Sequence, residues 1–133
     1  MTEVASIDIG QPFTTTPVDL VPSAGRINLQ ANFTVGTPGQ ASPTGLSVTA
    51  WVQTTLDGGL TWIDATNFTF GAVSARLIMT VFPRDSVSVP LAATDGTLAA
   101  NSAPETVLGP TWRVKYAVSG VYPAGTTLRI DAV

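Results

Sequence analysis

The sequence predicts an all-β protein, an antiparallel β-sandwich or jelly roll of about eight strands. Three observations carry this prediction. Apolar and polar residues alternate in several short runs, glycines and prolines separate those runs, and no segment shows a helical apolar period of convincing length. Short strands that follow one another closely are typical of folds in which two sheets bury their inner faces against each other.

The first expected strand is Val4–Ile9, where Ala5 and Ile7 alternate with Ser6 and Asp8. Further strands are expected in this order: Arg26–Val35, Leu46–Thr54, Leu60–Ala65, Phe68–Phe70, Ala75–Phe82, Asp85–Val89, Thr111–Val118 and Thr127–Val133.

Residues 10–25 are the first of two extended segments within a single sandwich domain spanning 1–133. They contain Pro12, Pro17 and Pro22, and proline cannot donate a hydrogen bond to a sheet ladder. We therefore expect an edge strand or an extended connection here, and no central strand.

Two strands alternate almost ideally. In Arg26–Val35 and Leu46–Thr54 every second residue is apolar, which predicts one face in the core and one polar face. Trp51 falls on the polar face. Either a neighbouring loop covers it, or it marks a contact surface, because aromatic side chains anchor interfaces.

A hairpin is expected at Thr55–Trp62. Its centre, Asp57-Gly58-Gly59, supplies residues that tolerate the positive φ of a tight antiparallel turn. The strand that follows is expected to break at Thr66-Asn67 and to resume at Phe68.

The run Ala75–Phe82 is apolar on both faces in its second half. This pattern indicates a strand covered on both sides, in the middle of a sandwich or at a subunit interface. Residues 90–110 form the second extended segment. Within them Leu91–Pro104, around Asp95-Gly96, is too long for an ordinary connection, and we expect an inter-subunit arm.

The last two strands place Trp112, Val114 and Tyr116 inward in one, and Leu128 and Ile130 inward in the other. If they form a hairpin, an opposite-charge pair follows. Arg113 or Lys115 would then lie opposite Asp131.

Composition narrows the function. The 133 residues include no cysteine and no histidine, and only 11% are charged, against about 25% in an average domain. The missing side chains exclude thiolate chemistry and every mechanism that needs imidazole as base or ligand. We expect no enzyme activity and no cofactor.

The charge balance argues against two classes of partner. A net charge of −3 with six scattered basic residues offers no basic stripe for phosphates, so nucleic acid is not an expected partner. No apolar run approaches the roughly 18 residues that span a bilayer, and the first residues do not resemble a secretion signal. We expect no membrane contact.

Three sets of side chains have a chemical and a structural interpretation. Asp57 and Asp64 could share a hard cation, or Asp57 could accept hydrogen bonds from its own turn. Arg113 and Lys115 could bind an anion, or form a solvated face paired with acids. The aromatic residues could form a sugar-stacking platform or belong to the core: Trp51, Trp62, Trp112, Tyr116 and Tyr122.

The segment Thr55-Leu-Asp-Gly-Gly-Leu-Thr-Trp62 resembles the Asp-box, the Ser-x-Asp-x-Gly-x-Thr-Trp hairpin of sialidases and other β-propellers, with Thr55 in place of Ser. In that family the motif is a structural turn distant from the catalytic site, which implies that Thr55, Asp57, Gly59, Thr61 and Trp62 fix a turn. A propeller needs several copies and this chain has one, so sialidase activity is not implied.

The chain as a whole resembles small virion proteins of tailed bacteriophages. The resemblance rests on the Thr-rich, Cys-free β pattern, on Leu-Gly-Pro-Thr-Trp-Arg-Val-Lys-Tyr from Leu108 and on Gly-Thr-Thr-Leu-Arg-Ile-Asp from Gly125. It implies a capsid decoration or cement protein, made in the host cytoplasm and located on the virion surface. Such a protein would bind the major capsid protein and associate with itself, as a homotrimer.

Two other functions stay open: a phage tail or adaptor component, and a carbohydrate-binding module that uses Trp51. The residues expected at an interface lie on the polar face around Trp51 and in the second extended segment. They are Trp51, Thr49, Gln53, Leu91, Thr94, Asp95 and Leu98.

Overall fold

The computed structural model describes residues 1–10, 13–21, 25–36, 45–84 and 90–132, and it confirms the all-β prediction. Eight strands form two four-stranded antiparallel sheets. They are β1 Thr2–Asp8, β2 Val18–Asp19, β3 Ile27–Thr34, β4 Ser47–Thr55, β5 Ile63–Phe70, β6 Ala75–Val81, β7 Thr111–Ser119 and β8 Thr127–Ala132. Over the described ranges, no helix has the length and apolar character needed to cross a membrane. The expected strand Asp85–Val89 lies outside the described residues.

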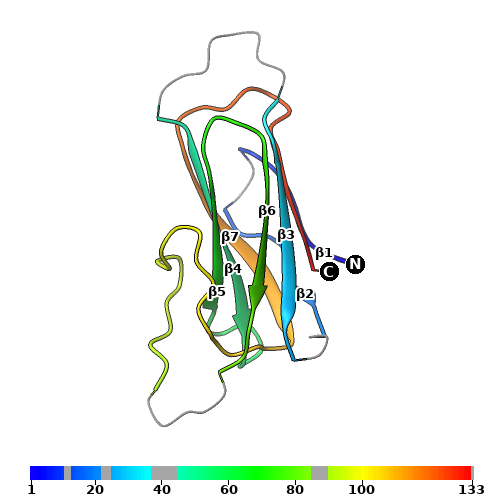
Figure 1. The fold of residues 1–133 in the computed structure, drawn as a ribbon, viewed down its shortest axis with the longest axis vertical. Coiled ribbons are helices and arrows are strands. Elements are labelled where there is room, and N and C mark those ends of the chain that lie inside the picture. The colour runs from blue at the N-terminus through cyan, green and yellow to red at the C-terminus, as the bar shows by residue number, and fades with distance from the viewer. Residues whose placement is uncertain (11–12, 22–24, 37–44, 85–89, 133) are drawn as a thin grey trace.

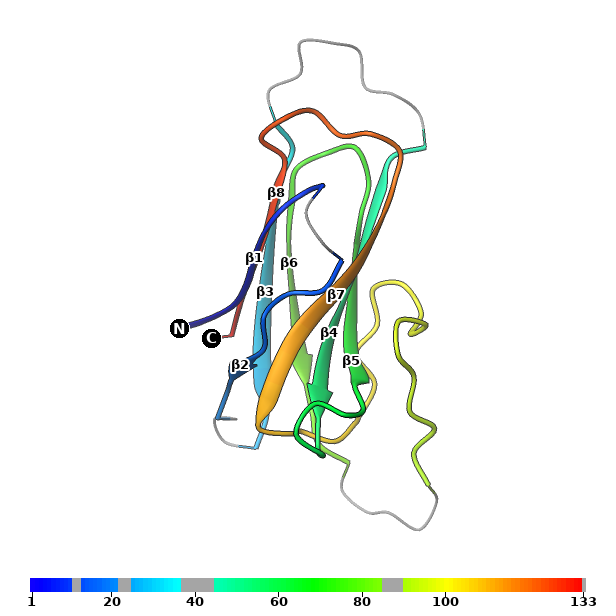
Figure 2. The same cartoon turned by 180° about the vertical axis from the view of Figure 1, so that it is seen from behind.

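The two sheets face each other as a sandwich (Figures 1 and 2). Sheet I has the order β1-β8-β3-β6, and sheet II has the order β2-β7-β4-β5. Consecutive strands β5 and β6 belong to different sheets, and so do β7 and β8. β7 and β8 therefore do not form a hairpin, and the charge pair of Arg113 or Lys115 with Asp131 that depended on it is wrong. The Asp131 carboxylate lies instead 3.0 Å from Nε of Arg129 on its own strand.

The core is built from the inward residues of the alternating strands. The apolar residues of β3 and β4 that were expected to face inward are buried, and so are Trp112, Val114 and Tyr116 of β7. Phe33 of β3 stacks on Phe70 of β5 with ring centroids 4.8 Å apart, which joins the two sheets. Period-two alternation therefore identified the buried face because each sheet has one face in the core.

β5 is continuous from Ile63, so the break expected at Thr66-Asn67 is wrong. The irregularity lies in its pairing with β4: Val52 lies opposite Thr66, whereas Gln53 lies opposite Asp64. Ala65 is thus the extra residue of a β-bulge. A bulge re-aims a neighbouring side chain, and here Asp64, the residue before the bulge, lies beside Gln53 on the outer face of sheet II.

β6 is an edge strand of sheet I, and the interpretation that placed it in the middle of the sandwich is wrong. Its inner residue Val81 is fully buried, but Ile78 on the outer face is 65% exposed. In the sequence, an exposed apolar residue such as Ile78 looks the same as one that is covered by a second layer. Periodicity therefore could not distinguish an edge strand with an exposed outer face from a strand buried on both faces. The subunit-interface interpretation stays a proposal.

The first extended segment contributes the short edge strand β2, which pairs with β7 through Val18 and Trp112. Before it, Phe13 packs against Tyr116 with ring centroids 5.7 Å apart. The second extended segment lies along the β5 side of sheet II (Figures 1 and 2), and its contacts form the candidate site.

Candidate functional site

The hairpin between β4 and β5 is a turn closed by side-chain hydrogen bonds. The Thr55 hydroxyl donates to Asp57 Oδ1 at 2.9 Å and accepts from the Gly59 N–H at 3.0 Å, and Asp57 Oδ1 also accepts from the Thr61 N–H at 2.8 Å. Gly58 and Gly59 have φ of 72° and 97°, values that a side chain would strain. The Asp57–Gly59 centre therefore forms the tight turn that the motif implied.

Hydrogen bonds lower the pKa of Asp57 to about 2, with the bond from the Thr61 side chain as the largest cause, followed by those from the Thr61 backbone and the Thr55 side chain. A carboxylate that accepts several hydrogen bonds holds its negative charge more strongly. At the end of the turn the Trp62 indole N–H donates to the Gly59 carbonyl at 3.1 Å, and the Arg113 guanidinium lies 4.2 Å from the Trp62 ring centroid. The turn is thus fixed at both its acid and its aromatic end.

Asp64, seven residues after Asp57 in the sequence, is the centre of a second network. Its side chain is buried on the outer face of sheet II beneath residues 94–98. Its carboxylate accepts hydrogen bonds of 2.8–3.1 Å from the backbone N–H groups of Gly96, Thr97 and Leu98, and one of 2.8 Å from the Thr94 hydroxyl. Successive N–H groups that converge on one anion form a nest.

The Gln53 amide connects this nest to the sheet. It donates to Asp64 at 2.9 Å and to Asp95 at 2.6 Å, while its oxygen accepts from Nε of Arg113 at 2.9 Å. The ammonium of Lys115 lies 3.2 Å from the Asp95 carboxylate. These contacts lower the pKa of Asp95, with the hydrogen bond from Gln53 as the largest cause. Arg113 and Lys115 are thus engaged by neighbours within the chain.

Asp57 and Asp64 belong to two separate hydrogen-bond networks. Each carboxylate accepts hydrogen bonds from the backbone of its own chain, Asp57 from its turn and Asp64 from the nest. Among the described residues, no three histidine, cysteine, aspartate or glutamate side chains come together as metal ligands would. The arrangement is that of two structural acceptors.

Residues 94–102 also shield the free edge of β5. The Asp64 and Asn67 N–H groups donate to the carbonyls of Thr94 and Ser102 at 2.8 and 3.0 Å. Further along, the Thr69 N–H donates to Oδ1 of Asn101 at 2.9 Å. Since an uncovered edge exposes a row of unpaired backbone groups, this segment satisfies β5 in place of another strand.

Trp51 lies under the same segment. Its indole N–H donates to the Leu98 carbonyl at 3.0 Å, and the Asn67 side chain donates to the same carbonyl at 2.7 Å. Of the two interpretations of Trp51, the structure shows the covered one, because a loop of the same chain lies against the ring and uses its polar atom.

The expected interface residues are therefore mostly brought together inside one chain. Gln53 is fully buried and has no surface to offer a partner. Trp51, Thr49, Leu91, Thr94 and Leu98 are half-buried, and Asp95 is exposed. The stretch expected as an inter-subunit arm packs, from Thr94 to Ser102, on its own sheet.

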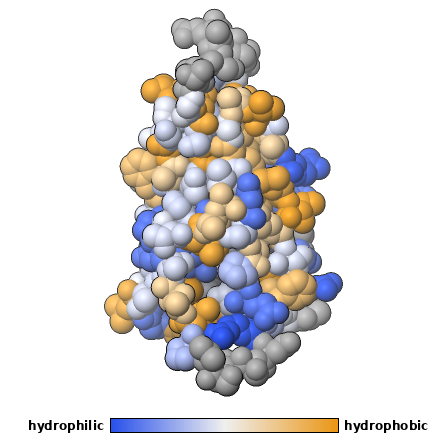
Figure 3. All heavy atoms as spheres, turned by 60° about the vertical axis from the view of Figure 1, so that its left-hand side comes forward, coloured by the Kyte–Doolittle hydropathy of each residue, from blue (hydrophilic) through white to orange (hydrophobic). Residues whose placement is uncertain are grey.

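Sequence reasoning missed two exposed leucines on the hairpin. Leu56 and Leu60 flank the Asp57–Gly59 turn and are 61% and 89% exposed. The signal was present in the sequence, because the side chains of two large apolar residues inside a turn motif cannot form its hydrogen bonds. Figure 3, which brings the β5 side forward, shows apolar surface in separate patches among neutral and hydrophilic surface.

Comparison with known proteins gives no relative: no protein-family model, no curated protein and no solved structure matches this chain.

Proposed function

We propose that this protein is a non-enzymatic structural component of a bacteriophage virion, a decoration or cement protein that binds the major capsid protein and stabilises the shell. The observation that carries the proposal is the pair of leucines, Leu56 and Leu60, held outward on a hairpin that is closed by its own side chains.

The rigidity of the hairpin favours a binding role for these leucines. Ordering a loop on binding costs free energy, and a loop that is already fixed avoids that cost. The bonds from Thr55 and Asp57 hold the turn in one conformation before any partner arrives. Burying both leucines at a partner would contribute about 1.5–3 kcal/mol for each side chain.

The low charge of the chain supports the same class of function. Only six residues are basic and nine acidic, and Lys115, Asp95, Arg129 and Asp131 pair within the chain. A surface with few free charges forms large contacts without a high desolvation cost. This suits a protein that stays bound to a shell.

The experiment is co-sedimentation of the purified protein with capsids that lack it. The double variant Leu56→Ser/Leu60→Ser is expected to bind at least about a hundredfold more weakly, since truncating two buried anchors removes at least about 1.4 kcal/mol each. The matched control is Val73→Ser/Val121→Ser, which removes two exposed apolar side chains from the β5–β6 and β7–β8 connections, at the opposite end of the sandwich. The control is expected to bind like the unchanged protein.

Binding to tails instead of shells would replace the decoration role with a tail or adaptor role. Binding to a glycan array without binding to either particle would contradict the proposal and favour a carbohydrate-binding module. Equal loss in both double variants would show that the hairpin is not the contact.

A further inference from the structure

The sandwich has four edge strands, and three of them carry a feature that prevents pairing with another chain. β1 contains a bulge between Glu3 and Ala5 and carries the charges of Glu3 and Asp8. β2 has only two residues and follows Pro17. β5 is covered by residues 94–102. Bulges, charges, short length and covering segments are the usual protections of a sheet edge.

β6 lacks these protections along most of its length. It pairs with β3 in unbroken register from Ala75 to Val81 and contains no proline. Over the described residues, the backbone of Ala75–Thr80 makes no hydrogen bond to any segment other than β3. Coverage begins beyond the strand, where the Phe82 carbonyl accepts from the Thr106 N–H at 3.1 Å.

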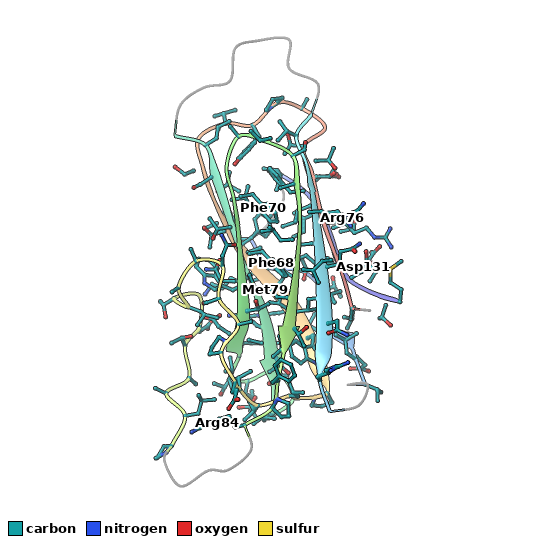
Figure 4. The ribbon with its side chains drawn as sticks, in the orientation of Figure 1. Phe68, Phe70, Arg76, Met79, Arg84 and Asp131 are labelled. Atoms are coloured by element: carbon teal, nitrogen blue, oxygen red, sulfur yellow. The ribbon has the colours of Figure 1, made fainter. Side chains whose placement is uncertain are left out.

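The one charged residue of β6, Arg76, does not protect the unpaired edge of the strand. Nε of Arg76 donates to the Asn32 side chain of β3 at 2.7 Å, so the guanidinium is held over the interior of the sheet. Figure 4 shows the Arg76 side chain toward β3 and away from β5, while Met79 lies with Phe68 on the inner side. The free edge thus has no bulge, its one charged side chain is held toward β3, and Ile78 lies on the outer face of the strand.

We propose that this edge binds a second copy of the same chain, β6 against β6 in antiparallel orientation about a two-fold axis. The two copies of sheet I then form one continuous eight-stranded sheet, because each copy contributes the four strands β1, β8, β3 and β6. Backbone hydrogen bonds between edges supply the attraction, as they do wherever an extended strand is added to a sheet.

The strand is complementary to itself. In an antiparallel self-pair centred on Leu77 or Ile78, Arg76 lies opposite Ile78 or Thr80 of the second copy, so like charges never face each other. The sequence Ala-Arg-Leu-Ile-Met-Thr-Val is rich in residues that favour strands. Cross-strand contacts of β-branched and long apolar side chains contribute about 0.2–1 kcal/mol per pair.

The interface is small. Six free residues bury less than the roughly 1,200 Å² of a standard protein interface, so the dimer is expected to dissociate on dilution. An isologous contact of this kind closes as a dimer, which differs from the trimer that the phage resemblance implied. At the high local concentration of a surface lattice, a weak two-fold contact would tie neighbouring copies together.

The test is sedimentation equilibrium of the full chain from about 10 μM to about 1 mM, the range in which a weak dimer dissociates. We expect a monomer–dimer equilibrium and greater amide-exchange protection of Ala75–Thr80 at the high end. Ile78→Lys adds a charge at the free edge and is expected to weaken the dimer at least about tenfold. The control, Val121→Lys, adds the same charge at an exposed position in the β7–β8 connection, outside β6, and is expected to leave the dimer unchanged.

A monomer at every concentration would overturn the proposal. A trimer, or a dimer that Ile78→Lys leaves intact, would overturn it as well, and circular dichroism confirms that each variant is folded. The capsid experiment uses residues at the hairpin, so either proposal can fail while the other holds.

Discussion

Strands β5 and β6 end their respective sheets on the same side of the sandwich, yet their free edges differ. The β5 edge is closed by residues 94–102, which bond to its backbone and surround the Asp64 carboxylate. The β6 edge from Ala75 to Thr80 bonds only to β3 within the described residues. The contrast shows that one exposed edge can be closed by a segment without secondary structure, provided that a side chain anchors it.

The anchor is what makes the cover of β5 possible. Backbone N–H groups in a loop need acceptors, and a loop that lies flat on a sheet loses water as its acceptor. Asp64 supplies one carboxylate for three such groups, and the bulge at Ala65 turns it toward them. β6 has no comparable acceptor on its outer face, where its charged residue is cationic.

The largest effect is expected from removing the anchor. Asp64→Asn replaces one acceptor oxygen by a donor that faces N–H groups, so buried donors lose their partner at a cost of about 3 kcal/mol. Chemical denaturation should show this loss in the free energy of unfolding, with faster amide exchange in residues 94–102. The control is Asp95→Asn, an exposed carboxylate in the same segment, whose loss should be much smaller. Equal losses would show that Asp64 does not anchor the cover.

A smaller effect is expected from Trp51→Phe. The change keeps an aromatic ring under residues 94–102 but removes the indole donor to the Leu98 carbonyl, a bond worth about 1 kcal/mol. Thermal unfolding should show a lower midpoint. Exchange should increase around Leu98 and stay unchanged in β6. An unchanged midpoint would show that the Asn67 side chain alone satisfies this carbonyl.

Acid should destabilise the packing of residues 94–102 on β5, by less than the Trp51→Phe change does. The pKa of Asp95 is lowered from 3.8, chiefly by the hydrogen bond from Gln53, so its carboxylate stabilises the fold above about pH 4. This contribution is lost as the pH falls below 3.8 toward the lowered value. Amide exchange of residues 94–98, corrected for intrinsic rates, should rise between pH 4 and pH 2. In the Asp95→Asn variant, amide exchange of residues 94–98 should rise less between pH 4 and pH 2 than in the unchanged protein.

The smallest effect on folding is expected at β6. Ile78→Lys changes a side chain that is 65% exposed, so the free energy of unfolding of the monomer should change by less than about 0.5 kcal/mol. The measurement is denaturation at low micromolar concentration. A larger loss would show that the outer face of β6 is part of the chain's own packing, which would end the contrast between the two edges.

Local patterns in the sequence predicted local structure. Alternation identified the inward residues of β3, β4 and β7, because the residue period of a strand matches its two faces. The residue types of Asp57-Gly58-Gly59 predicted the turn, because few residues accept its backbone angles. These features depend on neighbours within a few residues.

Long-range features could not be predicted in this way. The bulge at Ala65 exists because Val52 and Gln53 pair on either side of it, and no residue of β5 signals it alone. Asp64 bonds to Leu98, more than thirty residues away, and the sequence offered it only as a metal candidate. Nor does periodicity state whether a strand such as β6 lies inside a sheet or at its edge.

The strand order also constrains how the chain folds. β8 is the last strand in the sequence, yet it lies between β1 and β3, with Thr2 opposite Ala132 on one side and Thr34 opposite Thr127 on the other. Sheet II needs only residues up to Ser119 for its strands, whereas β1 has no partner in sheet I until β8 arrives. Closing contacts over such separations is slow. During synthesis, therefore, sheet II can assemble before β8 is made, and β1 gains its partner in sheet I only when β8 follows.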